Sequence, residues 1–203
     1  SAARVWWLFK LMGKTDVAVL DVTDEGSVAA CLGALEGPFD AVITATGALE
    51  ISAEGPEKSL RALDPAAMAA QFALNAIGPA MVLKHAAALL PRDRRAVFAA
   101  LSARVGSIGD NRAGGWYSYR AAKAALNQII RTGAVELSRS HPDLACVVLH
   151  PGTVQTPLTA KYLGRHPAVT PDQAAENLWT VINGLVPRDT GRFFDWAGKE
   201  VPW

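Results

Sequence analysis

The stretch AVFAALSARVGSIGDNRAGGWYSYRAAKAALNQ (residues 96–128) runs from an apolar strand pattern through a glycine-containing loop into a helix pattern. Its first six residues are all apolar, as expected of a strand that is covered on both faces. The run SYRAAKAALNQIIRTGAVEL (118–137) is rich in alanine and leucine and predicts a long helix. A buried strand that leads into a helix is typical of an α/β protein with a parallel sheet.

The same alternation extends outward in both directions. Asp64 followed by Pro65 predicts a helix start with an N-cap and a proline in the first turn, and this helix should run to about Leu90 with Gly78–Pro79 as the place for a kink. Further apolar runs predict strands at RVWWLF (4–9), VAVL (17–20), AVIT (41–44), ACVVL (145–149) and RFFDW (192–196). We find no repeat and no linker, so we expect one doubly wound α/β domain over residues 1–203.

Composition restricts the function classes. The chain has 203 residues, 50% of them hydrophobic, and a formal net charge of +1, which gives no electrostatic footprint for nucleic acid or anionic lipid. The longest apolar stretches are interrupted by Gln71, Lys84 or His85 and predict buried helix rather than a membrane span. The two cysteines are too few for a disulfide framework. We therefore expect a cytoplasmic protein with no nucleic-acid partner, no membrane partner and no metal.

Polar or glycine-bearing residues follow four predicted strands in turn. In a doubly wound sheet, ligands bind at the carboxyl ends of the strands, so these residues carry the most functional information. Any one such loop is ordinary turn chemistry, but four together favour a shared ligand-binding edge. The segments are DVTD (21–24), ATG (45–47), SARVGS (102–107) and HPGTVQT (150–156).

Tyr119 and Lys123 are four residues apart on the predicted helix and therefore share a face, separated by roughly 6 Å along the axis. Tyr117 is six residues from Lys123 and points away from it. An ammonium beside a phenol should lower the pKa of Tyr119 from about 10, which suits general acid–base chemistry on a carbonyl or hydroxyl group. Taken alone the spacing is a weak signal, but its place after a strand and a glycine-containing loop strengthens it.

With these motifs in place, the chain resembles the short-chain dehydrogenase/reductase family over nearly its whole length, in particular the bacterial branch around the C-factor and carbonyl-reductase-like proteins. The resemblance implies a Rossmann-like, three-layer α/β/α fold. It also implies that Tyr119 is the general acid, that Lys123 lowers its pKa and holds the nicotinamide ribose, and that Asn75 in LNAIGPA supports a proton relay. A serine after the strand at 96–101 would steady the substrate oxygen.

The resemblance also implies a cofactor site. Asp21 and Val22 match the family's acidic-apolar pair at the adenine ring, and Thr46 and Gly47 match its segment after the fourth strand. Lys10 stands where a basic residue would hold the 2′-phosphate of NADP, so NADP(H) is favoured and NAD(H) stays open. The family's Pro-Gly-x-x-x-Thr loop, which holds the carboxamide, matches Pro151, Gly152, Val154 and Thr156, and the catalytic residues Asn75, Tyr119 and Lys123 would also contact the cofactor.

The sequence departs from the family at two places. The family opens with a strand and a Thr-Gly-x-x-x-Gly-x-Gly turn for the pyrophosphate, and nothing before Arg4 supplies them, so we expect the sequence to be N-terminally incomplete. The family's usual Ser-Ser pair is replaced by Ser102 and Ala103. Ser102 is the favoured catalytic serine, and Ser107 in the same loop is the alternative.

These features predict an NAD(P)-dependent oxidoreductase that acts on a small carbonyl or alcohol substrate. The alternatives are a cofactor-binding or signalling protein without turnover and a structural relic that binds no dinucleotide. We expect Trp116, residues 110–115 and residues 158–169 to line the substrate pocket, the last as a lid or a plain surface loop. By resemblance, the long helices 64–90 and 116–138 would pair in a homodimer or homotetramer.

Overall fold

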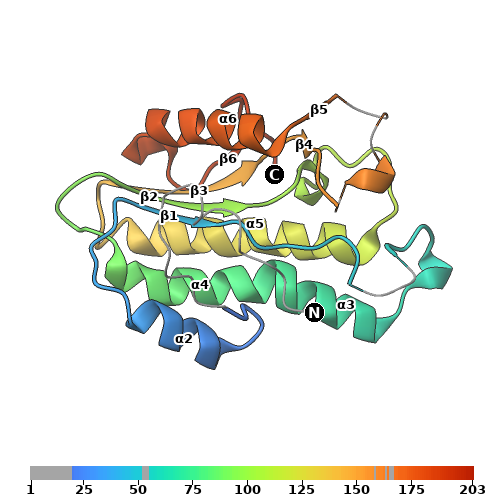
Figure 1. The fold of residues 1–203 in the computed structure, drawn as a ribbon, viewed down its shortest axis with the longest axis horizontal. Coiled ribbons are helices and arrows are strands. Elements are labelled where there is room, and N and C mark those ends of the chain that lie inside the picture. The colour runs from blue at the N-terminus through green and yellow to red at the C-terminus, as the bar shows by residue number, and fades with distance from the viewer. Residues whose placement is uncertain (1–19, 52–54, 158, 163, 165–166) are drawn as a thin grey trace.

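The computed structural model describes residues 20–51, 55–157, 159–162, 164 and 167–203, and within them it holds a four-stranded parallel sheet with helices on both faces (Figure 1). Neighbouring strands pair in the order β1-β2-β3-β6. Their bounds are β1 Ala41–Thr44, β2 Ala96–Leu101, β3 Leu144–His150 and β6 Phe193–Asp195. A separate two-stranded parallel ribbon pairs β4 Thr153–Val154 with β5 Ala168–Val169.

The α/β fold and its parallel sheet are confirmed, and the four strands predicted after residue 40 lie where the sequence puts them. The ranges 41–44 and 96–101 match β1 and β2 at both ends. The predicted strand at 4–9 and nearly all of the one at 17–20 lie outside the described residues. The prediction of one domain over the whole chain stays a prediction.

The helices form the two outer layers of the fold. Figure 1 shows α6 above the sheet and α5, α4 and α2 below it. The helix bounds are α2 Glu25–Gly33, α3 Pro65–Phe72, α4 Gly78–Ala86, α5 Tyr117–Leu137 and α6 Pro171–Gly184. Thr170 is the N-cap of α6, and its hydroxyl accepts a hydrogen bond from the Gln173 backbone N–H at 3.3 Å.

Two apolar cores lie on opposite faces of the sheet because strand side chains alternate between the faces. Phe98 and Cys146 belong to the core toward α4 and α5. Val97 and Val147, one residue away in each strand, belong to the core toward α6. The strands β2 and β3 are almost entirely buried, which explains why their sequences are continuous apolar runs.

The helical segment from Pro65 to Leu89 is not a uniform α-helix. It begins at the predicted N-cap, where the Asp64 carboxylate accepts from the Ala67 N–H at 2.7 Å. Residues Ala73–Ile77 form a wider π-helical turn directly before Gly78–Pro79. Pro79 has no N–H to donate to the carbonyl of Asn75 four residues earlier, and the wider turn accommodates its ring. The irregularity was predicted as a kink and is found as a π turn that contains Asn75.

This same segment is long and apolar enough to cross a membrane by length and composition alone. In the structure it is a packed helix of the lower layer, since α4 contacts α2 and α5, and α3 contacts α5. Its polar residues Gln71 and Asn75 are buried and hydrogen-bonded to a neighbouring loop. These contacts are typical of a core helix.

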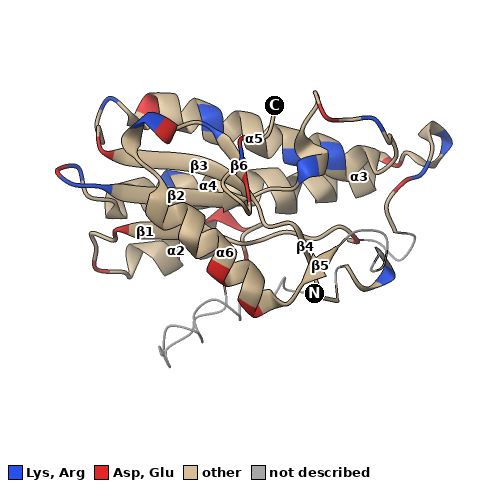
Figure 2. Cartoon of the chain, turned by 90° about the horizontal axis from the view of Figure 1, so that it is seen from above, with Lys and Arg blue, Asp and Glu red and all other residues tan. Residues whose placement is uncertain are grey.

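The charged residues are spread over many elements (Figure 2). Oppositely charged partners connect separate parts of the chain, as in Lys84 with Glu25 at 2.5 Å and Arg94 with Asp40 at 2.9 Å. Positive and negative side chains are thus interspersed, in keeping with the formal net charge of +1.

Candidate active site

Asn75 connects the π turn to the loop that follows β1. Its side chain is fully buried, its Nδ2 donates to the Ala48 carbonyl at 3.0 Å, and its Oδ1 accepts from the Ala48 N–H at 3.2 Å. Gln71, one turn earlier, accepts a second hydrogen from Asn75 Nδ2 and donates to the Leu49 carbonyl at 2.8 Å. The two amides therefore fix the backbone just beyond Gly47, so Asn75 orders one wall of the site.

Lys123 lies where the ends of β1 and β2 meet α5. Its Nζ donates to the Leu101 carbonyl at 3.0 Å, and the side chain is 2% exposed. A Cβ added at Gly47 would stand 2.9 Å from Asn75 Oδ1 and 3.1 Å from Lys123 Nζ. Gly47, Asn75 and Lys123 therefore converge as the sequence predicts, and a side chain at position 47 would crowd both Asn75 and Lys123.

Tyr119 is buried on the same helix, and the Lys123 ammonium lies 5.9 Å from its ring centroid. Burial raises the pKa of Tyr119 to about 12 and lowers the pKa of Lys123 to about 8. The predicted lowering of the tyrosine pKa is therefore wrong for this structure. Desolvation penalises the phenolate, and no hydrogen bond joins the two side chains in the described structure to offset it. At neutral pH the phenol keeps its proton and the ammonium is mainly charged, which is the pairing that a proton donor requires.

The two candidate serines differ in how their hydroxyl groups are engaged. Ser107 Oγ accepts from the Asp110 backbone N–H at 3.1 Å and so caps a turn. Ser102 Oγ is buried and has no hydrogen-bond partner within the described part of the chain. Gly106 brings this loop onto α5, since a Cβ there would lie 2.9 Å from the Lys123 backbone carbon. Ser102 Oγ is thus unengaged in the described structure, whereas Ser107 Oγ already accepts one backbone hydrogen bond, which favours Ser102.

The loop after β3 carries the predicted carboxamide-binding residues. Gly152 has φ +77°, and a Cβ there would lie 2.8 Å from Trp196 Cδ1, so the Pro151–Gly152 turn needs a glycine. The Val154 carbonyl accepts from the Thr159 hydroxyl, and the Thr156 N–H donates to that same hydroxyl at 3.1 Å. The loop is therefore tied to itself, and the cofactor roles of Pro151, Gly152, Val154 and Thr156 stay predictions.

Asp21 and Val22, the two residues predicted to contact the adenine ring, lie just before α2. Asp21 is exposed, and hydrogen bonds from the Thr23 hydroxyl and N–H lower the pKa of its carboxyl group. Val22 is buried against Gly78, where a Cβ would lie 2.9 Å from Val22 Cγ2. Their contact with an adenine ring stays a prediction, and Lys10 lies outside the described residues.

The substrate-pocket predictions are partly visible. Trp116 stands before α5 with φ +53°, and its ring meets that of Tyr119 edge-on, with centroids 6.5 Å apart. Gly114 and Gly115 also have positive φ, so the chain turns sharply just before α5. Four residues of the 158–169 segment, namely 158, 163, 165 and 166, lie outside the described set, and its role as a lid stays a prediction.

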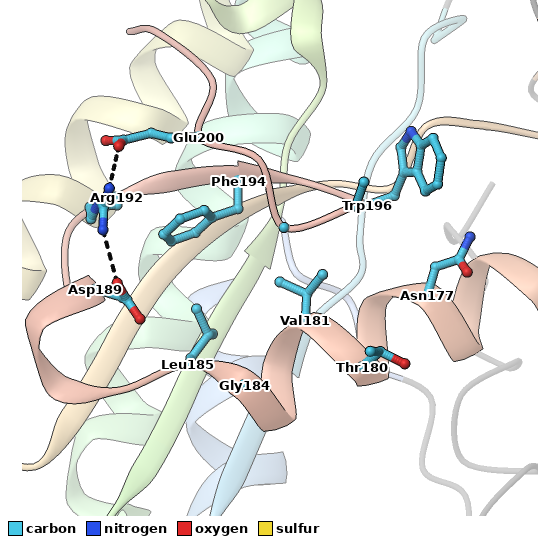
Figure 3. Close-up of a pocket in the computed structure, with 12 residues that line it drawn as sticks. Asn177, Thr180, Val181, Gly184, Leu185, Asp189, Arg192, Phe194, Trp196 and Glu200 are labelled. Atoms are coloured by element: carbon cyan, nitrogen blue, oxygen red, sulfur yellow. Dashed lines mark hydrogen bonds and ion pairs between the residues drawn. The ribbon is translucent and has the colours of Figure 1, made fainter.

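A further pocket of the described structure lies away from these residues (Figure 3). It is a groove of about 660 Å³ between α6 and the C-terminal segment, floored by Val181, Leu185 and Phe194. At one end Arg192 bonds Asp189 at 2.9 Å and also pairs with Glu200. Val181, Leu185 and Phe194 belong to the core toward α6, so the groove is on the opposite face from Tyr119 and Lys123.

Comparison with known proteins decides the family. The family model described as enoyl-(acyl carrier protein) reductase matches residues 4–180. The chain belongs to the short-chain dehydrogenase/reductase family. It is 37% identical over 171 residues to a protein named C-signal from Myxococcus xanthus, an alignment that covers 82% of this chain and 94% of that one.

Two further relatives of this family are similar over most of their length. A 1-hydroxy-2-glutathionyl-2-methyl-3-butene dehydrogenase from Rhodococcus sp. (strain AD45) is 34% identical over 187 residues, covering 91% of this chain and 78% of that one. The structure of an NADPH-bound carbonyl reductase from chicken fatty liver superposes with a TM-score of 0.79 at 26% identity, covering 97% of this chain and 81% of that one.

The site residues also fit the dinucleotide cofactor that the family implies. Three buried hydroxyl groups at or just beyond the ends of β1 and β2 have no hydrogen-bond partner within the described residues. Leaving a buried polar atom unpaired costs roughly 1–3 kcal/mol. Their common place at the strand ends is what a ligand with hydroxyl, phosphate and amide groups requires. The three hydroxyl groups are those of Thr44, Thr46 and Ser102.

Sequence reasoning missed three residues that the structure brings to the site. Gln71 could have been found, because a polar residue four positions before Asn75 shares its helix face within an apolar run. His150 stood inside a quoted strand-end segment and was not singled out. Glu57 had no signal, since its contacts with Ser118 span 61 positions of sequence.

Proposed function

We propose that the protein is an NAD(P)-dependent oxidoreductase that transfers hydride between a nicotinamide dinucleotide and a small carbonyl or alcohol substrate, with NADP(H) favoured. The observation that carries the proposal is the convergence of Lys123, Asn75 and Gly47 beside the buried Tyr119 on one edge of a parallel sheet. The preference for NADP(H) rests on Lys10 and on the NADPH-bound carbonyl reductase of similar fold.

When bound, the cofactor supplies the hydride, and the protein supplies the proton and the orientation. In the reductive direction Tyr119 donates its phenolic proton to the substrate oxygen as that oxygen gains charge. The Lys123 ammonium stabilises the phenolate that results, and it would also hold the nicotinamide ribose of a bound cofactor. Ser102 donates a hydrogen bond to the same substrate oxygen, and Asn75 orders the proton relay to Lys123. Thr46 and Gly47 allow close passage of the cofactor.

Replacing Tyr119 by phenylalanine tests this proposal. Tyr119→Phe removes the transferable proton but keeps the ring, so we expect turnover of NADPH with carbonyl substrates to fall at least 100-fold while NADPH still binds. Tyr117→Phe is the matched control, because Tyr117 is on the same helix but six residues from Lys123, and it should keep near-normal turnover. A Tyr119→Phe variant with a rate similar to the wild type would overturn the assignment.

A second candidate is a cofactor-binding signalling protein without turnover. It is favoured by the 37% identity to a protein named C-signal across 94% of that protein's length, and by Ala103 in place of the usual second serine. Titration with NADPH followed by tryptophan fluorescence, together with a carbonyl panel, separates the candidates. Binding without oxidation of NADPH favours the signalling protein, and absence of binding favours a structural relic. The cytoplasmic location and the homo-oligomeric state stay predictions.

A further inference from the structure

His150 is the last residue of β3 and follows six buried residues in that strand. The ladder pairs Leu101 with Leu149, and the Ser102 N–H donates to the Leu149 carbonyl at 2.8 Å, so Ser102 and His150 are the next residues in register. Adjacent strands are about 4.8 Å apart, and residues in register on parallel strands point to the same face. His150 and Ser102 are therefore immediate neighbours at the edge of the sheet.

The shared face is the one that carries the catalytic helix. Ala100 and Val148, two positions earlier in the two strands, both belong to the core toward α4 and α5. Because strand side chains repeat every two residues, Ser102 and His150 also point to this face. It is the face on which Lys123 of α5 bonds the Leu101 carbonyl.

Both side chains hold a buried polar atom without a partner in the described structure, namely Ser102 Oγ and His150 Nδ1. A hydroxyl group and an imidazole nitrogen are complementary hydrogen-bonding groups, and each would otherwise carry the cost of an unpaired buried atom. On the other side of His150, Asp195 is in register with it, but Asp195 Oδ1 already accepts from the N–H groups of Ala197 and Lys199. On the β2 side of His150, Ser102 is the hydroxyl partner that the register offers to Nδ1.

The charge state of the imidazole fits this pairing. Burial and the nearby Arg104 cation lower the pKa of His150 to about 4, against the opposing influence of Asp195. The ring is therefore neutral at pH 7 and carries one N–H. If that hydrogen is on Nδ1, it can be donated to Ser102 Oγ, whereas the other tautomer would accept the serine hydrogen and turn it away from the substrate.

We propose that His150 is a positioning residue that donates its Nδ1–H to Ser102 Oγ and thereby directs the serine hydrogen toward the substrate oxygen. The proposal rests on the proposed function in one respect, which is the role of Ser102 at that oxygen. His150 does not touch the substrate. It acts by fixing which way the hydroxyl group of Ser102 points.

The tautomer of His150 can be read without any turnover. We expect ¹⁵N NMR of the wild-type protein at pH 7 to show a neutral His150 with the hydrogen on Nδ1, its signals identified among the 4 histidines by their loss in His150→Asn. In Ser102→Ala the Nδ1–H loses its acceptor, so we expect the tautomer ratio or the Nδ1 shift to change. A hydrogen found on Nε2, or spectra of His150 that do not respond to Ser102→Ala, would overturn the proposal even if the protein is an active reductase.

Turnover measurements with NADPH and a carbonyl panel test the consequence. His150→Asn keeps an amide nitrogen near the position of Nδ1, so we expect kcat within about threefold of the wild type, whereas His150→Leu should lose about tenfold in kcat with KM little changed. In the Ser102→Ala background, His150→Leu should cause no further loss, because positioning acts only through that hydroxyl. Equal losses in Asn and Leu, or losses that multiply in the double variant, contradict the proposal. A wild-type protein without turnover contradicts the proposed function instead, and the NMR result then decides the positioning alone.

Discussion

Lys123 is 2% exposed, and at the residue scale this burial has an energetic consequence. Its pKa falls from 10.5 to about 8, because the charged form loses its hydration. Between about pH 8 and pH 10.5 the unfolded chain therefore binds more protons at this residue than the folded chain does. The free energy of unfolding should rise with pH across that window as far as Lys123 is concerned. Below pH 8 the penalty for the buried charge is fully present.

The penalty for the buried Lys123 charge predicts that Lys123→Met stabilises the protein while it removes activity. A fall of the pKa from 10.5 to about 8 corresponds to about 3 kcal/mol, and the lost hydrogen bond to Leu101 offsets part of it. We expect urea unfolding at pH 7 to show a gain of about 1–3 kcal/mol for the variant and a smaller gain at pH 10. Lys84→Met, at an exposed lysine, is the control and should change little at either pH. A loss of stability at pH 7 in Lys123→Met would contradict the prediction.

At the scale of the helix, α5 has an unusual beginning. Its N-cap residue, Trp116, has φ +53° and makes no side-chain cap bond. Glu57 takes over that role from a distant loop, since its carboxylate accepts from the Ser118 hydroxyl and N–H, and its carbonyl accepts from the Trp116 N–H at 2.5 Å. A carboxylate at this end also interacts favourably with the helix dipole. The position of Tyr119, one residue after Ser118, therefore depends on Glu57.

We expect Glu57→Ala to lower the free energy of unfolding by about 1 kcal/mol, the usual cost of a lost cap, and to reduce turnover because the first turn of α5 loosens around Tyr119. Glu57→Gln keeps a hydrogen-bond acceptor, so it should retain part of the stability and part of the turnover. Asp64→Ala removes the cap of α3 instead, so it should cost similar stability and leave turnover nearly unchanged. If both alanine variants lose turnover equally, the effect is general destabilisation and not the placement of the catalytic helix.

The elements differ in how far the sequence predicts them. AVIT and AVFAAL were readable as strands because both are short and mostly apolar, and Asp64–Pro65 was readable as a helix start because capping is local. The π turn around Asn75 was not, because the sequence shows that Pro79 removes a donor but not how the helix accommodates it. Glu57 and the raised pKa of Tyr119 depend on contacts and burial formed by distant segments, which no local pattern encodes.

At the scale of the whole molecule, the fold gathers residues from the ends of β1, β2 and β3, from α5 and from the turn between α3 and α4 at one edge of the sheet. The register between strands brings Ser102 beside His150, and the π turn brings Asn75 beside Gly47 and Lys123. The motifs predicted that these residues share a site, since ligands of such sheets bind at the strand ends. They could not predict the row of unpaired buried atoms there, because that depends on which polar atoms the packed chain leaves over.

A cofactor that binds at these unpaired atoms should stabilise the folded state, so the Tm of the protein reports cofactor binding. A ligand at 100 times its Kd stabilises the folded state by about 2.7 kcal/mol, and a domain of this size gains roughly 2–4 °C in Tm per kcal/mol. We expect NADPH to raise Tm by about 5–10 °C at saturation in thermal unfolding followed by fluorescence, and NADH to do so less at equal concentration. Lys10→Ala should reduce the difference between the Tm shifts caused by NADPH and NADH, because a basic residue at this position favours the 2′-phosphate.

The Tm shift that NADPH causes in two glycine variants tests where the cofactor binds. Gly47→Ala places a Cβ 2.9 Å from Asn75 Oδ1 and 3.1 Å from Lys123 Nζ, at the point where the cofactor would pass, so the NADPH shift should largely disappear. Gly184 has no atom within 4 Å of an added Cβ and lies on the α6 face, so Gly184→Ala should keep the full shift. If NADPH raises Tm equally in both variants, the dinucleotide binds away from the Asn75–Lys123 edge, and the Tyr119 chemistry loses its hydride source.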